Sequence, residues 1–219
     1  MNTPHIECRR FALPAACHFP EPQKKDLIVL CATGSVTAES AVTAWRRKSN
    51  LHAVPYVVDP DGTVFETFDP RGWAFHLKMP AQMNPAARND RRSIAISLVN
   101  PGGLKQRADG KLAWWLDGFT KVWCDPDDSS RCMKATFRGF NYFAKYTDAQ
   151  FKALQSLVPW LCREHGIPWQ LPAPSERLAA DPRRFARFRG ILAHHHFRPE
   201  HADIGPAFDW DRISPPQEA

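Results

Sequence analysis

The segment from residue 190 to residue 210 constrains the fold of this chain more than any other. A short apolar run at residues 191–193 leads directly into three consecutive histidines, and His201 and Asp203 follow within a few residues. Imidazole and carboxylate groups are ligands that zinc commonly takes in proteins. The pattern therefore predicts an apolar strand that delivers the histidines to a polar loop, where they and the nearby His201 and Asp203 could hold a metal ion in a rigid site.

Several other short apolar runs have the character of buried strands. Residues 26–31 and 93–99 are almost continuously apolar, which is typical of central strands that are covered on both faces. Residues 54–58 and 63–68 are rich in β-branched and aromatic side chains and flank an Asp-Gly turn, a strong signal for a hairpin. These runs predict the strands of one sheet.

Two segments have helical periodicity. Residues 38–50 and 147–165 each carry apolar side chains on one face. In the second segment Thr147 and Gln150 stand in the positions of a capping box, and Pro159 is expected to kink or break the helix locally. Strands that alternate with helices predict an α/β fold, here a single domain with a central mixed β-sheet flanked by helices.

The length of the chain and the absence of internal repeats favour one domain. The chain has 219 residues, enough for one sizeable core. We expect residues 1–25 to form an N-terminal extension, residues 26–213 to form the domain, and residues 214–219 to be a C-terminal tail. The stretch around 105–145 is rich in tryptophan and acidic residues and is expected to be an insertion in that domain.

The chain is basic, with a formal net charge of +6. Its basic residues are scattered, and the sequence has no basic stripe with interleaved aromatic residues and no known nucleic-acid-binding motif, so we predict no nucleic-acid partner. An anionic cell wall or an acidic substrate would suit this charge, and so would a solvated basic face with no partner. No apolar run approaches the ~20 residues that a membrane helix needs, so we predict no membrane insertion.

The N-terminus and the cysteines bear on the compartment. Residues 1–10 lack the apolar core of a secretory signal, which predicts a cytoplasmic location by default and leaves export by phage lysis or injection machinery open. The six cysteines are too sparse for a disulfide scaffold, and most are expected to be reduced and partly buried. Cys124 and Cys132 flank an acidic loop and could pair in an oxidising compartment.

Three motifs point to a known family. Residues 203–210 read Asp-Ile-Gly-Pro-Ala-Phe-Asp-Trp, residues 93–100 read Ser-Ile-Ala-Ile-Ser-Leu-Val-Asn, and residues 73–76 read Trp-Ala-Phe-His. In this order they resemble the closing motif, a central strand and a Trp-His region of the zinc-dependent N-acetylmuramoyl-L-alanine amidases of the amidase-2 and peptidoglycan-recognition type. The resemblance runs from about residue 26 to residue 210, and it implies an amidase-2-like fold for the whole domain.

The resemblance implies one zinc ion per chain and a muropeptide or peptidoglycan fragment as the ligand. The metal would be held by Cys31, which stands where the family has a histidine, together with His194 and Asp203. His201 stands where the family commonly has a lysine and would stabilise an oxyanion. Ser97 takes the place of the family's catalytic glutamate, and a serine cannot serve as a general base unaided.

Further residues near these motifs are candidates for supporting roles. His76, His195 or His196 could replace the missing base. The groups expected to orient a metal ligand or to contact the substrate are His195, His196, Trp73 and Asn100.

Three functions are compatible with these residues. The first is a peptidoglycan amidase that hydrolyses the N-acetylmuramoyl–L-alanine amide bond by zinc-activated water. The second is a catalytically degenerate amidase-fold protein that binds a muropeptide or another ligand without hydrolysis, because the positions of Cys31 and Ser97 have both changed. The third is a metal-free thiol enzyme that uses Cys31, His194 and Asp203 as nucleophile, base and orienting group. Metal coordination and a catalytic triad demand different ring orientations, which ranks the third hypothesis last.

Overall fold

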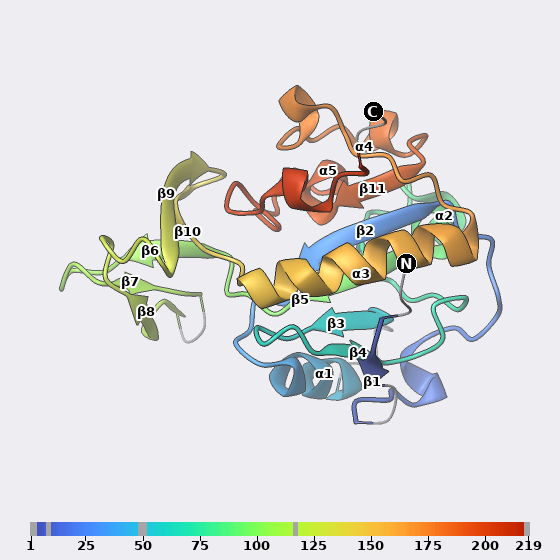
Figure 1. Ribbon diagram of the computed structural model, residues 1–219, viewed down its shortest axis with the longest axis horizontal. Coiled ribbons are helices and arrows are strands. Elements are labelled where there is room, and N and C mark those ends of the chain that lie inside the picture. Colours follow the sequence, from blue (N-terminus) through green and yellow to red (C-terminus); the bar gives the residue numbers. More distant parts are fainter. Residues whose placement is uncertain (1–3, 8–9, 48–51, 116–117, 217–219) are drawn as a thin grey trace.

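The centre of the molecule is a six-stranded mixed β-sheet, seen in a computed structural model that describes residues 4–7, 10–47, 52–115 and 118–216 (Figure 1). In spatial order its strands are β1 (Ile6–Glu7), β4 (Val64–Glu66), β3 (Tyr56–Val58), β5 (Ser93–Leu98), β2 (Leu27–Ala32) and β11 (Gly190–Ala193). Strands β3, β5, β2 and β11 are parallel to one another, β4 is antiparallel to β3, and β1 is parallel to β4. The predicted mixed sheet, the hairpin and the strand before His194 are confirmed.

Strands β2 and β5 lie at the centre of the sheet because their side chains are apolar on both faces. Nearly every residue in the two strands is buried. The parallel register pairs Cys31 with Ser97 and Leu30 with Ala193. The carboxyl ends of β2, β5 and β11 therefore meet at one edge of the sheet, the edge at which parallel α/β sheets usually bind ligands.

The two longest helices are α1 (Ala38–Arg47) and α3 (Asp148–His165). Leu157 of α3 packs in one apolar cluster with Ile96, whereas Val42 of α1 packs in another with Ala95. Because neighbouring residues of a strand point to opposite faces, the two helices cover opposite faces of the sheet. The predicted layers of an α/β fold are thus observed.

The start of α3 is fixed by a capping box, as predicted. Gln150 N donates to Thr147 Oγ1 at 3.0 Å, and Thr147 N donates to Gln150 Oε1 at 3.1 Å. The expected break at Pro159 is wrong, because the helix continues to His165. Its fully buried side chains, among them Leu154 and Leu161, hold the helix against the sheet through the position where the proline removes one hydrogen bond.

Short helices complete the connections between the strands. Phe185 and Phe197 pack with Leu192 against the β11 side of the sheet. These helices are η1 (Ala15–Cys17), η2 (Pro85–Ala87), α2 (Arg88–Arg92), η4 (Pro174–Glu176), α4 (Pro182–Phe185), α5 (His194–Phe197) and η5 (Trp210–Ile213). Within the described residues, no helix is both long enough and apolar enough to cross a membrane.

A second sheet is formed by the stretch that the sequence analysis set apart around residues 105–145. It projects to one side of the central sheet (Figure 1) and is antiparallel throughout. Its core is apolar, and Cys124 and Cys132 are buried in it as free thiols. In spatial order its strands are β8 (Val122–Cys124), β7 (Leu112–Ala113), β6 (Gly103–Gln106), β10 (Phe140–Ala144) and β9 (Cys132–Phe137).

The residues before β2 are tied to the main sheet. Phe19 and Trp73 exchange backbone hydrogen bonds of 2.7 and 2.9 Å. The buried Lys25 ammonium donates to the carbonyl oxygens of Gly72 at 2.6 Å and Arg91 at 2.9 Å. This segment therefore fixes the loop after β4 and the end of α2 relative to each other.

Replacing Gly190 with alanine is expected to destabilise the fold, because Gly190 sets the path of β11 toward the site. Its φ is +133°, and an added Cβ would overlap the carbonyl oxygen of Gln170. We expect Gly190→Ala to lower the free energy of unfolding by about 2 kcal/mol or more, measured by urea denaturation. Gly110→Ala is the matched control, since Gly110 also has a positive φ (+82°) but an added Cβ would meet nothing within 4 Å. Equal losses in the two variants would contradict the role assigned to the overlap.

Candidate active site

The carboxyl ends of β2, β5 and β11 open into a cleft of about 400 Å³. The ends of β2 and β5, the start of α5 and the loop after α5 each contribute polar side chains to its walls. The metal and catalytic residues predicted from the sequence all line this cleft, namely Cys31, Ser97, His76, His194, His201 and Asp203.

Three of these residues form a cluster with metal-binding geometry. Among the described residues, His194, His201 and Asp203 offer ligand atoms that all lie within 4.8 Å of one another. The rings of His194 and His201 are 4.5 Å apart between centroids. Two imidazoles and one carboxylate are a donor set that zinc takes in catalytic sites, where a fourth position stays open. The cluster therefore has the composition of a catalytic rather than a closed structural site.

His194 is oriented by two hydrogen-bonding partners. Its Nε2 lies 3.2 Å from the carbonyl oxygen of Leu77, and its Nδ1 lies 3.2 Å from Asp203 Oδ2. If a metal were bound, a proton kept on Nε2 and donated to Leu77 O would leave the lone pair of Nδ1 for the metal, which is the usual way a backbone carbonyl fixes a metal-binding histidine. Burial alone would lower the pKa of His194, but the charge of Asp203 and the hydrogen bond to it outweigh burial and raise the pKa.

Asp203 connects the cluster to the rest of the fold. Its Oδ2 accepts a hydrogen bond from Ala32 N at 3.1 Å, and its Oδ1 lies 3.5 Å from His201 Nδ1. Burial alone would raise the pKa of this carboxyl, but the charge of His194 and the hydrogen bonds from both histidines hold the pKa well below its usual range. The carboxylate is therefore ionised and pre-oriented at the end of β2.

Cys31 and Ser97 are neighbours on adjacent strands, and neither belongs to the cluster of His194, His201 and Asp203. The Cys31 thiol is not in the three-residue group of ligand atoms; it donates to the carbonyl oxygen of Ile96 at 3.6 Å. Burial, together with the charge of Asp203, raises its pKa to about 12. Ser97 is buried beside it and is paired with it across the sheet. Neither side chain is an acid or base at neutral pH.

The other histidines singled out from the sequence are held by the fold. His76 lines the cleft, but its Nδ1 lies 3.0 Å from the carbonyl oxygen of Ala74 and its Nε2 lies 2.8 Å from Ser93 Oγ. Burial lowers the pKa of His76 to about 3. Both ring nitrogens are therefore occupied, and the ring is neutral.

His195 and His196 point away from the cleft toward η4. His195 Nε2 contacts the carbonyl oxygen of Arg177 at 2.7 Å, and His196 Nε2 contacts that of Glu176 at 3.2 Å. The other side of His195 supports the loop that carries Asp203, since its backbone N donates to Asp203 O at 3.1 Å and its Nδ1 contacts the same oxygen at 2.9 Å. His195 thus orients the segment that carries Asp203, whereas His196 joins α5 to η4.

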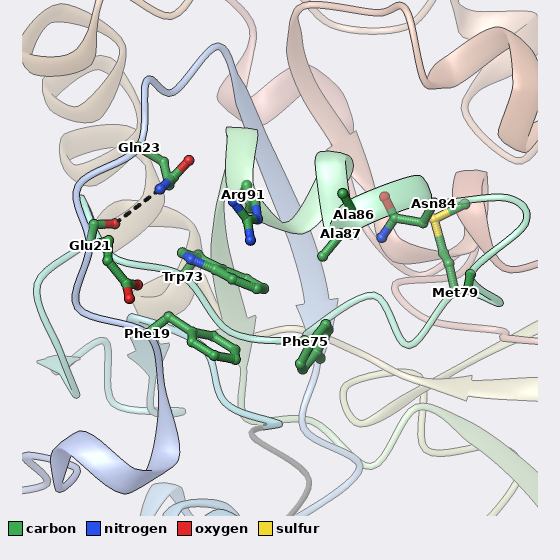
Figure 2. Close-up of a pocket in the computed structure, with 11 residues that line it drawn as sticks. Phe19, Glu21, Gln23, Trp73, Phe75, Met79, Asn84, Ala86, Ala87 and Arg91 are labelled. Carbon is green, nitrogen blue, oxygen red and sulfur yellow. Dashed lines mark hydrogen bonds between the residues drawn. The ribbon is translucent and has the colours of Figure 1, made fainter.

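Trp73 and Asn100 lie away from the cluster. The Asn100 side-chain amide donates to the carbonyl oxygen of Lys145 at 3.1 Å and its Oδ1 accepts from Gly102 N at 2.7 Å, so it ties together the two ends of the second sheet. Trp73 lines a different pocket (Figure 2). Neither side chain lines the cleft that holds the cluster.

The second sheet forms one wall of the cleft, a feature that sequence patterns did not reveal. Trp115 Nε1 donates to Gly34 O at 2.6 Å, and both Trp115 and Phe140 line the cleft. Arg138, in the turn between β9 and β10, reaches the loop that carries the cluster. Its Nη1 donates to the carbonyl oxygens of Arg198 at 2.9 Å and His195 at 3.3 Å, and also to that of His201.

Comparisons with known proteins identify the family to which this fold belongs. The family model described as N-acetylmuramoyl-L-alanine amidase, Amidase_2, matches residues 21–206. A search of curated proteins gave no match.

Solved structures of amidases are similar in fold. AmiD from E. coli, in complex with the substrate anhydro-N-acetylmuramic acid-L-Ala-D-gamma-Glu-L-Lys, has a TM-score of 0.54 at 17% identity; the match covers 88% of this chain and 57% of that chain. LysC from Clostridium intestinale URNW has a TM-score of 0.50 at 13% identity, with 96% and 95% covered. The catalytic domain of XlyA has a TM-score of 0.50 at 11% identity, with 89% and 87% covered. At these identities the likeness concerns the fold.

Arg138→Gln is expected to loosen the loop that carries the cluster, because hydrogen bonds from a guanidinium to three carbonyl groups would be lost. Amide hydrogen exchange should become about tenfold faster or more at Arg198 and at residues 200–203. Arg131→Gln is the matched control, since the Arg131 guanidinium lies in the same sheet but stacks on Trp123, 4.6 Å from the ring centroid. Unchanged exchange in Arg138→Gln would show that the loop holds its conformation without the second sheet.

Proposed function

The chain belongs to the N-acetylmuramoyl-L-alanine amidase family, Amidase_2, whose model matches residues 21–206, and we propose that it hydrolyses the amide bond between N-acetylmuramic acid and L-alanine in peptidoglycan fragments with the help of one zinc ion. The observation that carries this proposal is the cluster of His194, His201 and Asp203 in an open cleft. It supports a hydrolase more than a degenerate binding protein, because a protein that only binds has no need of three converging metal ligands.

The three residues fit a zinc ion by their chemistry and their support. His194 keeps one nitrogen for the metal while the other faces Leu77 O, and Asp203 is held ionised by Ala32 N and the two histidines. Zinc bound there would act as a Lewis acid on the scissile carbonyl and would lower the pKa of water. The cleft in front of the cluster is large enough for a small peptide or sugar group and is partly walled by aromatic side chains.

The third ligand in this proposal is His201 rather than Cys31. Cys31 stands at the position where the family has its first zinc ligand. However, the Cys31 thiol donates to Ile96 O, and its pKa is raised to about 12. A protonated thiol is a poor ligand, because zinc binds the thiolate. His201 stands where the family commonly has a lysine. In this proposal it is the third zinc ligand, in place of the residue at position 31.

The same facts weigh against a metal-free thiol enzyme. A nucleophilic cysteine needs a lowered pKa and a neighbouring base. The pKa of Cys31 is raised, and the Nδ1 of His194 faces Asp203 rather than the thiol.

The general base is proposed to be Glu200. Among the described residues that line the cleft, Glu200 and Asp203 carry carboxylates, and Asp203 is already assigned to the metal. Its side chain is exposed to solvent, and the hydrogen bond from Arg198 Nε at 2.5 Å lowers its pKa, so it is ionised at neutral pH. Ser97 cannot accept a proton from water, and both nitrogens of His76 are occupied. Glu200 would thus perform the proton transfer that the family assigns to a glutamate at the position of Ser97.

The choice of metal ligand is tested by zinc content. Protein prepared without a histidine tag should contain about one zinc ion per chain, Cys31→Ala should keep it, and His201→Ala should lose most of it, because three protein ligands are needed to hold a catalytic zinc. Elemental analysis after dialysis gives the result. Loss of zinc from Cys31→Ala with retention in His201→Ala would restore the ligand set inferred from the resemblance.

Catalysis is tested by the release of peptides that begin with L-alanine from a muropeptide. Asp203→Ala should abolish release, and Glu200→Gln should lower kcat by about 10²–10⁴ while zinc content stays unchanged. Ser97→Ala is the control and should keep the parent rate. If the parent binds the muropeptide without cleaving it and Ser97→Glu gains activity, the chain is a degenerate amidase.

A further inference from the structure

Trp115 is a large aromatic side chain that stays exposed although it lines the cleft. It lies in the loop between β7 and β8, on the second sheet that projects beside the central sheet (Figure 1). Its exposed fraction is 51%, and no other large apolar side chain in the described part of the chain is as exposed. Tryptophan is on average well buried in folded proteins. An indole left open inside a cleft therefore points to a ligand that covers it.

The Trp115 ring is held in one position by the backbone of the central sheet. Its Nε1 donates to Gly34 O at 2.6 Å. Gly34 has a φ of +64°, and an added Cβ there would lie 2.8 Å from Trp115 Nε1, so a glycine is what lets the indole come this close. Because the protein already uses the N–H group, Trp115 offers a ligand the apolar surface of its ring.

The same short segment after β2 holds both Trp115 and Asp203. Ala32 N donates to Asp203 Oδ2 at 3.1 Å, and Gly34 accepts the indole N–H two residues later. Two residues span at most ~7 Å of backbone. A group that stacks on Trp115 would therefore lie next to a bond that is cut at the cluster.

Phe140 continues the aromatic wall of the cleft. It lines the cleft at the start of β10, and an added Cβ on Gly103 would lie 2.5 Å from its ring, so the ring packs on the bare backbone of β6. The Lys105 ammonium lies 4.6 Å from the centroid of the Phe119 ring and 5.8 Å from that of Phe140. The cleft thus combines the polar groups of the cluster with aromatic surface that the second sheet supplies.

The chemistry of the proposed reaction decides which group would cover the indole. The bond to be cut joins a sugar to L-alanine. The alanine side chain is a single methyl group, too small to cover an indole. A pyranose ring is flat, directs C–H bonds from its face toward the negative face of an aromatic ring, and keeps its hydroxyl groups at the edge, where water can reach them. Exposed aromatic surface without a free polar group suits the sugar.

We propose that Trp115 determines specificity by stacking on the pyranose ring of N-acetylmuramic acid, with Phe140 as part of the same wall. The identity of the ligand rests on the proposed function, because that reaction places a sugar beside the cluster. The second sheet would then make the chain select substrates that still carry their sugar over free peptides.

The experiment measures sugar binding with ligands that have no amide bond to the peptide. N-acetylmuramic acid and D-lactate share the lactyl carboxylate and differ by the N-acetylated pyranose ring. A titration of the parent protein followed by NMR should give a dissociation constant about tenfold lower or more for N-acetylmuramic acid, with saturation transfer to the C–H protons of the ring. Trp115→Ala should remove both the difference and the transfer. Trp115→Phe, which keeps an aromatic face, should keep part of the affinity.

Trp123→Ala is the matched control. Trp123 lies in the same sheet, but its Nε1 donates to Arg131 O at 3.2 Å and it does not line the cleft, so sugar binding should not change. Absence of sugar binding to the parent protein, or a sugar affinity that Trp115→Ala leaves unchanged, would overturn the proposal. So would an equal loss for both ligands in Trp115→Ala, because the indole would then only shape the cleft. None of these measurements needs hydrolysis, so a failure of the proposed amidase activity would be seen separately, in the peptide-release assay.

Discussion

The largely buried carboxylate of Asp203 joins α5 and the loop that follows it to the end of the central strand β2. One oxygen accepts from the end of β2 through Ala32 N and faces His194, and the other faces His201. The backbone of the same residue accepts from His195 N. Because an ionised group is costly to bury without partners, this carboxylate can exist only where these donors converge. The closing loop, α5 and the central strand are therefore positioned together or not at all.

Much of the fold follows from local patterns in the sequence. The apolar runs that form β2, β5 and β11 and the Thr147–Gln150 capping box depend on side chains close together in the chain, and each appears where the pattern predicts it. Pro159 was misjudged because a sequence pattern counts the lost hydrogen bond and not the packing of a long buried helix face.

The site is only partly predictable for a related reason. The carboxyl ends of parallel strands meet at one edge of a sheet. The sequence could therefore predict that one cleft there would be lined by Cys31, His194, His201 and Asp203. Which of them converge depends on loop geometry within a few ångströms, and there the geometry favours His201 over Cys31. The contacts of Arg138 could not be foreseen at all, since they are made to backbone carbonyl groups that carry no sequence signature.

In the ligand set that we propose, the use of His201 would change what the metal site depends on. With a ligand at position 31, one donor would come from the end of a central strand, and the register of the sheet would set the ligand geometry. With His194, His201 and Asp203, all three donors come from one segment of ten residues. The sheet then contributes through β11, which ends at the residue before His194, and through Ala32 N. Such a segment needs a clamp from outside, because a loop alone cannot hold three ligands within the tolerance that a metal requires. The hydrogen bonds of Arg138 to three carbonyl groups of this segment supply it. Under the proposed ligand set, the second sheet would therefore support metal binding as well as shape the cleft.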